Sequence, residues 1–262
     1  MSLLPPDSLR SAYADREWTV AYEWPEQATT WRLDGGAARD ALFLKVVTSG
    51  HYPTALEEAE RMRWARPYLP VPDVVDSGSD GKVDWLLTRA LAGLDATRHP
   101  LLAEPEQLVP ILARALLAFH AAAPVAACPF GFGVETALAH ARERVRAGVA
   151  TSSDLHPEHS HLTMHDALDR LERLRPESED LVVCHGDYCF PNVLLSDAGA
   201  VTGYVDLGEL AIADRWWDVA LGAWSTTWNV GPGYEDVFYE AYGVGRDDDR
   251  IAFYRLLYDL AS

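Results

Sequence analysis

Short apolar runs separated by turn residues dominate the first third of the chain. Residues 18–24 (WTVAYEW), 29–36 (TTWRLDGG) and 41–47 (ALFLKVV) are rich in β-branched and aromatic residues, which favours strands. The DGG sequence at residues 34–36 suits a hairpin turn, and residues 82–93 (KVDWLLTRALAG) read as a further strand ending at a glycine. These runs predict a small sheet.

One helix is expected within this sheet-forming region. Residues 53–72 (PTALEEAERMRWARPYLPVP) read as a helix that stops at Pro67 and Pro70. The residues that recur at helical spacing are Leu56, Ala59, Met62 and Arg63. The first 90 residues therefore form a small strand-rich unit with one helix.

The remainder of the chain is mostly helical in pattern. Residues 105–122 (PEQLVPILARALLAFHAA) place their apolar side chains on one helical face, and further amphipathic segments are 135–150, 162–174, 234–244 and 247–262. Strand patterns return only near residues 181–187, 192–197 and 201–208. We expect an α+β, two-lobed protein, with a β-rich lobe over residues 1–90 and a larger helical lobe over residues 91–262.

Composition and charge narrow the classes of partner. The 262 residues carry a formal charge of −18, which argues against nucleic acid or an anionic membrane surface as a partner. The three cysteines form no CxxC pair, as is typical of reduced thiols in the cytoplasm. No signal peptide or membrane span is evident, so a cytoplasmic protein is expected. The sequence predicts no particular oligomeric state.

Polar residues interrupt two strand-like runs in a way that suggests chemistry. Asp187 and Asn192 lie between the apolar runs of residues 182–195 (VVCHGDYCFPNVLL), and two short strands later comes Asp206. If a hairpin returns Asp206 to the loop, two oxygen-bearing side chains could hold Mg²⁺, leaving a third carboxylate to take a proton. That is the working set for phosphoryl transfer.

Two longer motifs resemble a known family. HGDYCFPN (residues 185–192) and YVDLGELAIADRWWDVA (residues 204–220) are similar to the paired motifs of the aminoglycoside and antibiotic phosphotransferases, a small-molecule branch of the kinase-like fold. The chain looks closest to the aminoglycoside 3′-phosphotransferases. The resemblance implies ATP (with GTP possible) as phosphate donor, Mg²⁺ as cofactor and an aminoglycoside or related antibiotic as acceptor.

The resemblance also implies roles for residues around the phosphates. Asp187 would be the catalytic base, and Asn192 and Asp206 would bind Mg²⁺. Lys45 would contact the α- and β-phosphates, with Glu58 as its ion-pair partner; the neighbouring acids Glu57 and Glu60 are the alternatives for that partner.

Further nucleotide contacts and supporting residues follow from the same resemblance. The backbone at Arg89 and Ala90 would meet adenine, and the turn at residues 25–30 (PEQATT) would cover the nucleotide through its amides and the hydroxyl of Thr29 or Thr30. Residues expected to support the catalytic loop are His185, Asp214 and Asp218.

The acceptor pocket departs from the family pattern. Residues 149–163 (VATSSDLHPEHSHLT) keep Asp154 and Glu158 where more acids are usual. Near the C-terminus Tyr258 replaces an acid and Asp259 retains one.

A tryptophan also stands where the family pattern has an arginine. This is Trp224, and with Trp228 four positions later it shares a helical face that we expect to line the substrate site. Aromatic rings there would favour stacking of a planar or peptidic group.

Three alternative functions stay open at this point. The substrate could be a nucleoside or cyclic-peptide antibiotic, or a small metabolite of the choline or sugar type. A catalytically dead binding module with the same fold is disfavoured, because Asp187, Asn192 and Asp206 are all present.

Overall fold

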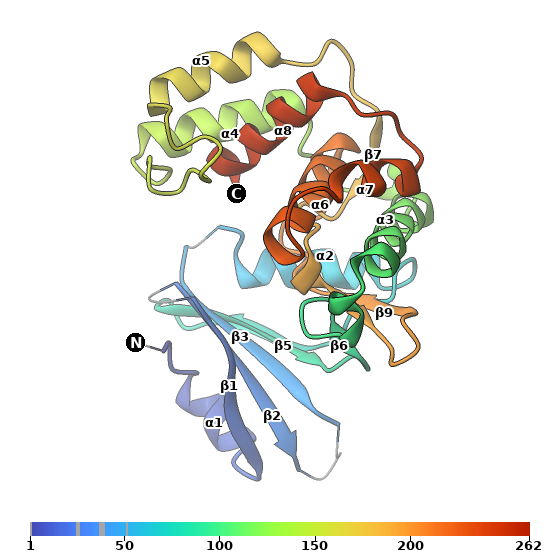
Figure 1. The fold of residues 1–262 in the computed structure, drawn as a ribbon. Coiled ribbons are helices and arrows are strands. Elements are labelled where there is room, and N and C mark those ends of the chain that lie inside the picture. Colours follow the sequence, from blue (N-terminus) through green and yellow to red (C-terminus); the bar gives the residue numbers. More distant parts are fainter. Residues whose placement is uncertain (1, 25–26, 37–39, 51) are drawn as a thin grey trace. The chain divides into compact units, whose positions relative to one another are not determined.

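The computed structural model describes residues 2–24, 27–36, 40–50 and 52–262 (Figure 1). The chain divides into two compact units. The first comprises residues 1–93 with residues 202–209, and the second comprises residues 94–201 with residues 210–262. The strand-rich beginning and helical remainder confirm the predicted α+β class.

The first unit is built on an antiparallel five-stranded sheet with the order β1-β2-β3-β5-β4. Its strands are β1 (Arg16–Trp24), β2 (Ala28–Gly35), β3 (Leu42–Thr48), β4 (Val74–Ser79) and β5 (Val83–Arg89). All are predicted from the sequence except β4, whose VVDSGS composition contains glycine, serine and aspartate and so lacks a strong strand signal.

Two helices cover opposite faces of this sheet. They are α1 (Asp7–Ala12), which is not predicted, and α2 (Ala55–Ala65). Leu44 on β3 packs in a cluster with Leu9 of α1, whereas Lys45 reaches Glu58 of α2. Because successive strand residues point to opposite faces, the α2 face of the sheet carries Lys45.

Helix α2 begins and ends where the sequence indicates, but its buried face differs from the prediction. Thr54 forms a capping box with Glu57, and the helix ends before Pro67. Leu56 is exposed and Glu58 is buried. Hydropathy alone would bury Leu56 and expose Glu58, and the structure shows the reverse.

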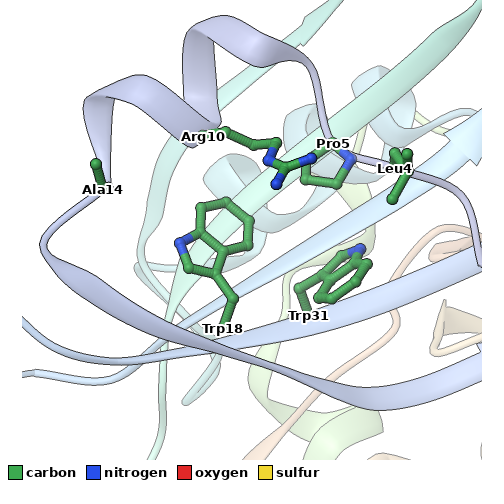
Figure 2. A pocket seen from close by; sticks show the side chains of 6 residues that line it. All are labelled: Leu4, Pro5, Arg10, Ala14, Trp18 and Trp31. Carbon is green, nitrogen blue, oxygen red and sulfur yellow. The ribbon is translucent and has the colours of Figure 1, made fainter.

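A hollow of about 300 Å³ lies beside α1 (Figure 2). Trp18 and Trp31 form its wall with their rings 6.2 Å apart, and Arg10 of α1 lines it too. Trp31 lies opposite Leu44 in the β2–β3 register, so this hollow is on the face of the sheet away from Lys45.

Residues 202–209 belong to the first unit, not to the helical lobe in which the sequence placed them. The Thr202 hydroxyl donates to the carbonyl of Ala92, and the Tyr204 amide donates to the carbonyl of Pro70 at 2.9 Å. A Cβ on Gly203 would come within 2.6 Å of that same carbonyl oxygen. These contacts join residues more than 100 positions apart in the sequence, so the local pattern of apolar and polar residues could not reveal them.

The second unit is mainly helical, as predicted. Its helices are α3 (Pro105–Ala122), α4 (Val134–Arg146), α5 (Met164–Leu174), α6 (Trp216–Asn229), α7 (Glu235–Tyr242) and α8 (Asp248–Ala261), with short 3₁₀ turns η1 (Pro100–Ala103), η2 (Val125–Ala127) and η3 (Phe190–Asn192). Helices α4, α5 and α8 lie side by side (Figure 1), and α6 packs on both α7 and α8.

Short strands carry the polar loop of this unit. β7 (Leu181–Cys184) pairs antiparallel with β10 (Ala211–Asp214), and β6 (Leu94–Asp95) pairs with β8 (Val193–Leu195). β9 (Val201–Tyr204) begins where the chain returns to the first unit. In the part of the chain that the structure describes, no helix has the length and apolar character needed to cross a membrane.

Candidate active site

The start of α6 holds the loop that follows β7. The carboxylate of Asp218 accepts the backbone N–H of His185 at 2.6 Å and that of Gly186 at 2.9 Å. The indole of Trp217 donates to the carbonyl of Gly186 at 2.6 Å. His185 and Asp218 are fully buried, so both lie where the sequence predicted supports for this loop.

A second predicted support, Asp214, stabilises the start of α6. Its carboxylate accepts the backbone N–H of Trp216 at 3.0 Å and pairs with Arg250 at 2.6 Å. Asp214 is buried, and the guanidinium of Arg250 compensates its charge inside the unit.

Behind the loop, His120, Cys184 and Asp218 bring possible ligand atoms within 4.8 Å of one another. Burial raises the pKa of the Cys184 thiol well above its ordinary value, and the charges of Asp218 and Asp214 raise it further. A metal ion would need the thiolate. His120 instead bonds Asp218 at 2.9 Å and Tyr242 at 2.8 Å, so the group acts as a brace for the loop.

Asp187 is held at both carboxylate oxygens. The side-chain amide of Asn192 donates to Oδ2 at 2.8 Å and to the Asp187 main-chain carbonyl at 2.9 Å. The hydroxyl of Tyr258, on α8, donates to Oδ1 at 3.0 Å. Asp187 is half-buried at the loop's surface, so its carboxylate is within reach of a bound molecule, and its predicted role as a base stays a prediction.

Lys45 lies between two carboxylates of the first unit. Its Nζ is 2.8 Å from Glu58 Oε2 and 2.7 Å from Asp206 Oδ1. Burial alone would lower the pKa of Lys45, but Asp206 and Glu58 outweigh it and raise that pKa above its ordinary value. Glu57 is used in the capping box, so the partner of Lys45 is Glu58, as the sequence predicted.

Asn192 and Asp206 both offer the hard oxygen donors that Mg²⁺ prefers. The amide nitrogen of Asn192 is engaged by Asp187, which leaves its carbonyl oxygen as the atom suited to a cation. Asp206 adopts φ of 60°, an uncommon conformation for a residue other than glycine. The donor chemistry fits the ion, and the predicted sharing of one ion by these two residues stays a prediction.

Only one of the two candidate nucleotide-binding threonines faces the side of Lys45. Thr30 is the register partner of Lys45, so both side chains lie on the same face of the sheet. Thr29 is buried on the other face, where its hydroxyl accepts the backbone N–H of Leu3 at 2.8 Å. The alternation of strand side chains therefore corrects the assignment of Thr29. Pro25 of the same predicted turn lies outside the described residues.

At the two residues whose backbone is predicted to meet adenine, the N–H groups already have partners. The amide of Arg89 donates to the carbonyl of Asp73 at 3.0 Å, and that of Ala90 donates to the carbonyl of Ala41 at 2.9 Å. A base could use these N–H groups only after those hydrogen bonds break.

An aromatic cluster formed by His156, Trp224 and Trp228 lies in the second unit. The two tryptophan rings are 4.8 Å apart, as their shared helical face predicts. His156 stacks on Trp228 with centroids 4.7 Å apart and planes at 10°. Trp228 is 42% exposed whereas Trp224 is 4% exposed, so Trp228 is the ring that an acceptor could contact.

Asp259, expected to contact substrate, is instead buried beneath this cluster. His156 and His159 place ring nitrogens 2.6 Å and 2.7 Å from its two oxygens. Burial opposes ionisation of Asp259, but these hydrogen bonds outweigh it and lower its pKa below the ordinary value. Asp259 is only 6% exposed and accepts hydrogen bonds at both oxygens, so it is not presented to a ligand ammonium group.

The other predicted acids of the pocket also have partners in the same unit. Glu158 lies 3.5 Å from a guanidinium nitrogen of Arg255, which also pairs with Glu235 at 2.6 Å. Asp154 accepts hydrogen bonds from the backbone and hydroxyl of Thr151 within its own loop.

Sequence reasoning missed His156, His159 and Arg255 as partners of the acids predicted to bind the acceptor. The available signal was the unusual density of histidine in residues 156–161, where acids were expected. Arg255 lies in the apolar pattern of α8 and is buried, which indicates a cation with internal acidic partners.

The chain is similar to known phosphotransferases along most of its length. Residues 23–254 match the model of the phosphotransferase enzyme family. The chain is 37% identical over 263 residues to an aminoglycoside 3′-phosphotransferase of Streptomyces fradiae, covering 95% of this chain and 97% of that protein.

Two solved structures extend this similarity to the fold. An aminoglycoside-3′-phosphotransferase of type VIII has a TM-score of 0.87 at 34% identity and covers 97% of each chain. The aminoglycoside phosphotransferase APH(3″)-Id of Streptomyces rimosus, in complex with ADP and streptomycin, has a TM-score of 0.79 at 27% identity and covers 97% of this chain and 96% of that one.

Proposed function

Because the chain belongs to the phosphotransferase enzyme family, we propose that it transfers the γ-phosphate of ATP to a hydroxyl group of an aminoglycoside antibiotic and so confers resistance. The observation that carries the proposal is the Asp187 carboxylate, fixed beside Asn192 on a braced loop, in a chain similar to such enzymes along nearly its whole length. The predicted cytoplasmic location is consistent with ATP as the donor; GTP stays possible.

In the proposed reaction the acceptor hydroxyl oxygen bonds to the γ-phosphorus while the bond from that phosphorus to the bridging oxygen of the nucleotide breaks. Asp187 takes the hydroxyl proton, and ADP leaves with the bridging oxygen. Asn192 keeps the Asp187 side chain in place during the transfer through its donated hydrogen bond.

Residues of the first unit would bind the nucleotide. Lys45 carries a fixed positive charge suited to the α- and β-phosphates, and buried Glu58 orients it. Thr30, on the same face of the sheet, offers a hydroxyl to a phosphate oxygen. We propose Lys45 and Thr30 as nucleotide contacts, with Glu58 orienting Lys45, ahead of Thr29, Arg89 and Ala90.

Asn192 and Asp206 would hold Mg²⁺ in the complete enzyme. When bound, the ion would neutralise charge that develops on the phosphate oxygens. Lys45 Nζ lies 2.7 Å from Asp206 Oδ1, so its positive charge faces one of the carboxylates that would hold the ion.

The acceptor would bind against the second unit. Exposed Trp228 offers a flat face for a sugar or cyclitol ring, and Glu158 offers a partly exposed carboxylate for an ammonium group. Asp154, on the exposed loop, is a further candidate for an ammonium contact.

A second candidate is supported by the partners of the pocket acids. Asp259 is hydrogen-bonded to two histidines, and Glu158 and Glu235 share Arg255. A pocket with internally paired acids and an exposed indole would also accept a less cationic antibiotic with a planar group, such as a nucleoside or cyclic peptide.

The experiment is a screen of the purified protein with ATP against aminoglycosides, nucleoside antibiotics and cyclic-peptide antibiotics. The readout is the mass of each antibiotic after incubation. A gain of one phosphoryl group on an aminoglycoside supports the proposal; a gain confined to another class selects the second candidate. No mass gain in any class, from protein that hydrolyses ATP, would overturn both.

A further inference from the structure

A tyrosine from helix α8 donates a hydrogen bond to the Asp187 carboxylate. Tyr258 lies on α8, and its hydroxyl is 3.0 Å from Asp187 Oδ1. Asn192 donates to the other oxygen from the opposite end of the loop. The loop's own donors to this carboxylate, Asn192 and the Cys189 thiol, are thus joined by a hydroxyl from a separate helix.

We propose that Tyr258 is a positioning residue, whose hydroxyl sets the orientation of Asp187 for the phosphoryl transfer. This inference rests on the proposed function, in which Asp187 takes the proton of the acceptor hydroxyl. The sequence pattern predicted that Tyr258 contacts the substrate; in this inference its hydroxyl instead binds the base Asp187.

The physical reason is the rotational freedom of an aspartate side chain. The terminal torsion of a carboxylate has a broad energy well, so each donor that reaches its oxygens narrows the range of orientations. The thiol of Cys189 lies 3.6 Å from Oδ1 and is a weak donor, whereas the Tyr258 hydroxyl lies 3.0 Å from the same oxygen and is the stronger restraint of the two. A carboxylate offers about four acceptor sites, so the bond from Tyr258 is compatible with acceptance of the substrate hydroxyl.

The chemistry of a phenol suits this position better than that of a carboxylic acid. An ionised acid beside Asp187 would repel it, whereas the Tyr258 O–H donates a hydrogen bond to the charged form.

Tyr258 is itself fixed by its neighbours. Its ring lies 6.3 Å from the ring of His156, which stacks on Trp228. The next residue, Asp259, is anchored by His156 and His159. The ring of Tyr258 therefore lies beside the aromatic cluster, and its hydroxyl contacts Asp187. Substitutions that remove the hydroxyl alone or the whole ring can test these two parts separately.

The central experiment compares the steady-state kinetics of wild type and Tyr258→Phe, which removes the hydroxyl and keeps the ring. We expect kcat to fall about tenfold through misorientation of the base, with the KM values for ATP and acceptor changed by less than about twofold. Tyr258→Leu, which also removes the ring, should in addition raise the acceptor KM. The thermal unfolding midpoint of Tyr258→Phe should match that of wild type.

Tyr234→Phe is the matched control. It also removes one tyrosine hydroxyl that donates to a carboxylate, at 2.9 Å to Glu106, but at the surface and away from the loop. Its kinetics should equal those of wild type. An equal loss of kcat in Tyr234→Phe would overturn the inference, because the effect would then not be specific to Asp187.

Two further outcomes would also overturn it. One is an unchanged kcat in Tyr258→Phe; the other is a raised acceptor KM with unchanged kcat, which would place the hydroxyl on the substrate. Asp187→Ala, measured in parallel, separates this inference from the proposed function. If Asp187→Ala is inactive while Tyr258→Phe is normal, only the role of Tyr258 is lost; if Asp187→Ala is fully active, the proposed base is lost as well.

Discussion

Lys45 and Asp206 lie 161 positions apart in the sequence, yet Lys45 Nζ is 2.7 Å from Asp206 Oδ1. The same ammonium group is 2.8 Å from Glu58. The ammonium group of Lys45, on the sheet, thus links helix α2 and the segment 202–209 of the first unit. Asp206, with φ of 60°, is held in place by this contact beside the proposed phosphate-binding lysine.

Removal of the Asp206 carboxylate should remove the effect of Mg²⁺ on nucleotide binding. In Asp206→Ala we expect calorimetry to show the same ATP affinity with and without Mg²⁺, and turnover to fall at least about a hundredfold. Asp197→Ala, which removes an exposed acid, is the control and should behave as wild type. Normal Mg²⁺ dependence in Asp206→Ala would remove Asp206 from the proposed metal site.

Neutralising Glu58 should weaken the use of ATP because Lys45 would lose the partner that orients it. For Glu58→Gln we expect kcat/KM for ATP to fall about tenfold, with little change in the acceptor KM. Glu60→Gln alters an exposed acid of the same helix and should stay within about twofold of wild type. Equal effects of the two substitutions would show that the ion pair has no special role.

The two tryptophans of the aromatic cluster should respond differently to truncation. Trp228→Ala removes a ring that is 42% exposed, so we expect the acceptor KM to rise while the KM for ATP and the unfolding midpoint stay near wild type. Trp224→Ala opens a cavity and should cost about 3–5 kcal/mol of unfolding free energy. Leu117→Ala, also 42% exposed, is the control for removal of an exposed apolar side chain. An unchanged acceptor KM in Trp228→Ala would exclude that ring from substrate binding.

Asp259 should make the stability of the protein sensitive to acid. Its folded-state pKa lies below the ordinary value of 3.8, so its ionised form stabilises the fold above that pH, and the contribution is lost as pH falls through the folded pKa. Urea unfolding of wild type and Asp259→Asn at about pH 5 and about pH 3 measures this. The stability difference between the two proteins should be larger at the higher pH; a constant difference would show that the charge of Asp259 does not stabilise the fold.

The sequence predicted those parts of the fold whose local pattern and tertiary environment agree. The run LFLKVV formed β3, residues 105–122 formed α3, and the acid of α2 chosen as partner of Lys45 was the correct one. The prediction fails where contacts between distant parts of the sequence determine the secondary structure. The strand β4 has weak intrinsic preference and forms because β5 pairs with it.

The same limit applies within the candidate site. Thr29 and Thr30 are adjacent and chemically identical, and only the β2–β3 register shows that Thr30 shares a face with Lys45. Asp259 looked like a free acid because nothing in its own segment indicates two histidines a hundred positions away. Motif spacing identified Asp187 and Asn192, whereas the partners that determine their geometry, such as Tyr258, come from elsewhere in the chain.

The most direct test of the account is the mass of an aminoglycoside after incubation with ATP, Mg²⁺ and either wild-type protein or Asp187→Ala. We predict that wild type adds one phosphoryl group and that Asp187→Ala adds it at least about a thousandfold more slowly, while both bind ATP. Phosphorylation by Asp187→Ala at the wild-type rate, or none by a wild-type protein that binds ATP and the antibiotic, would contradict the account.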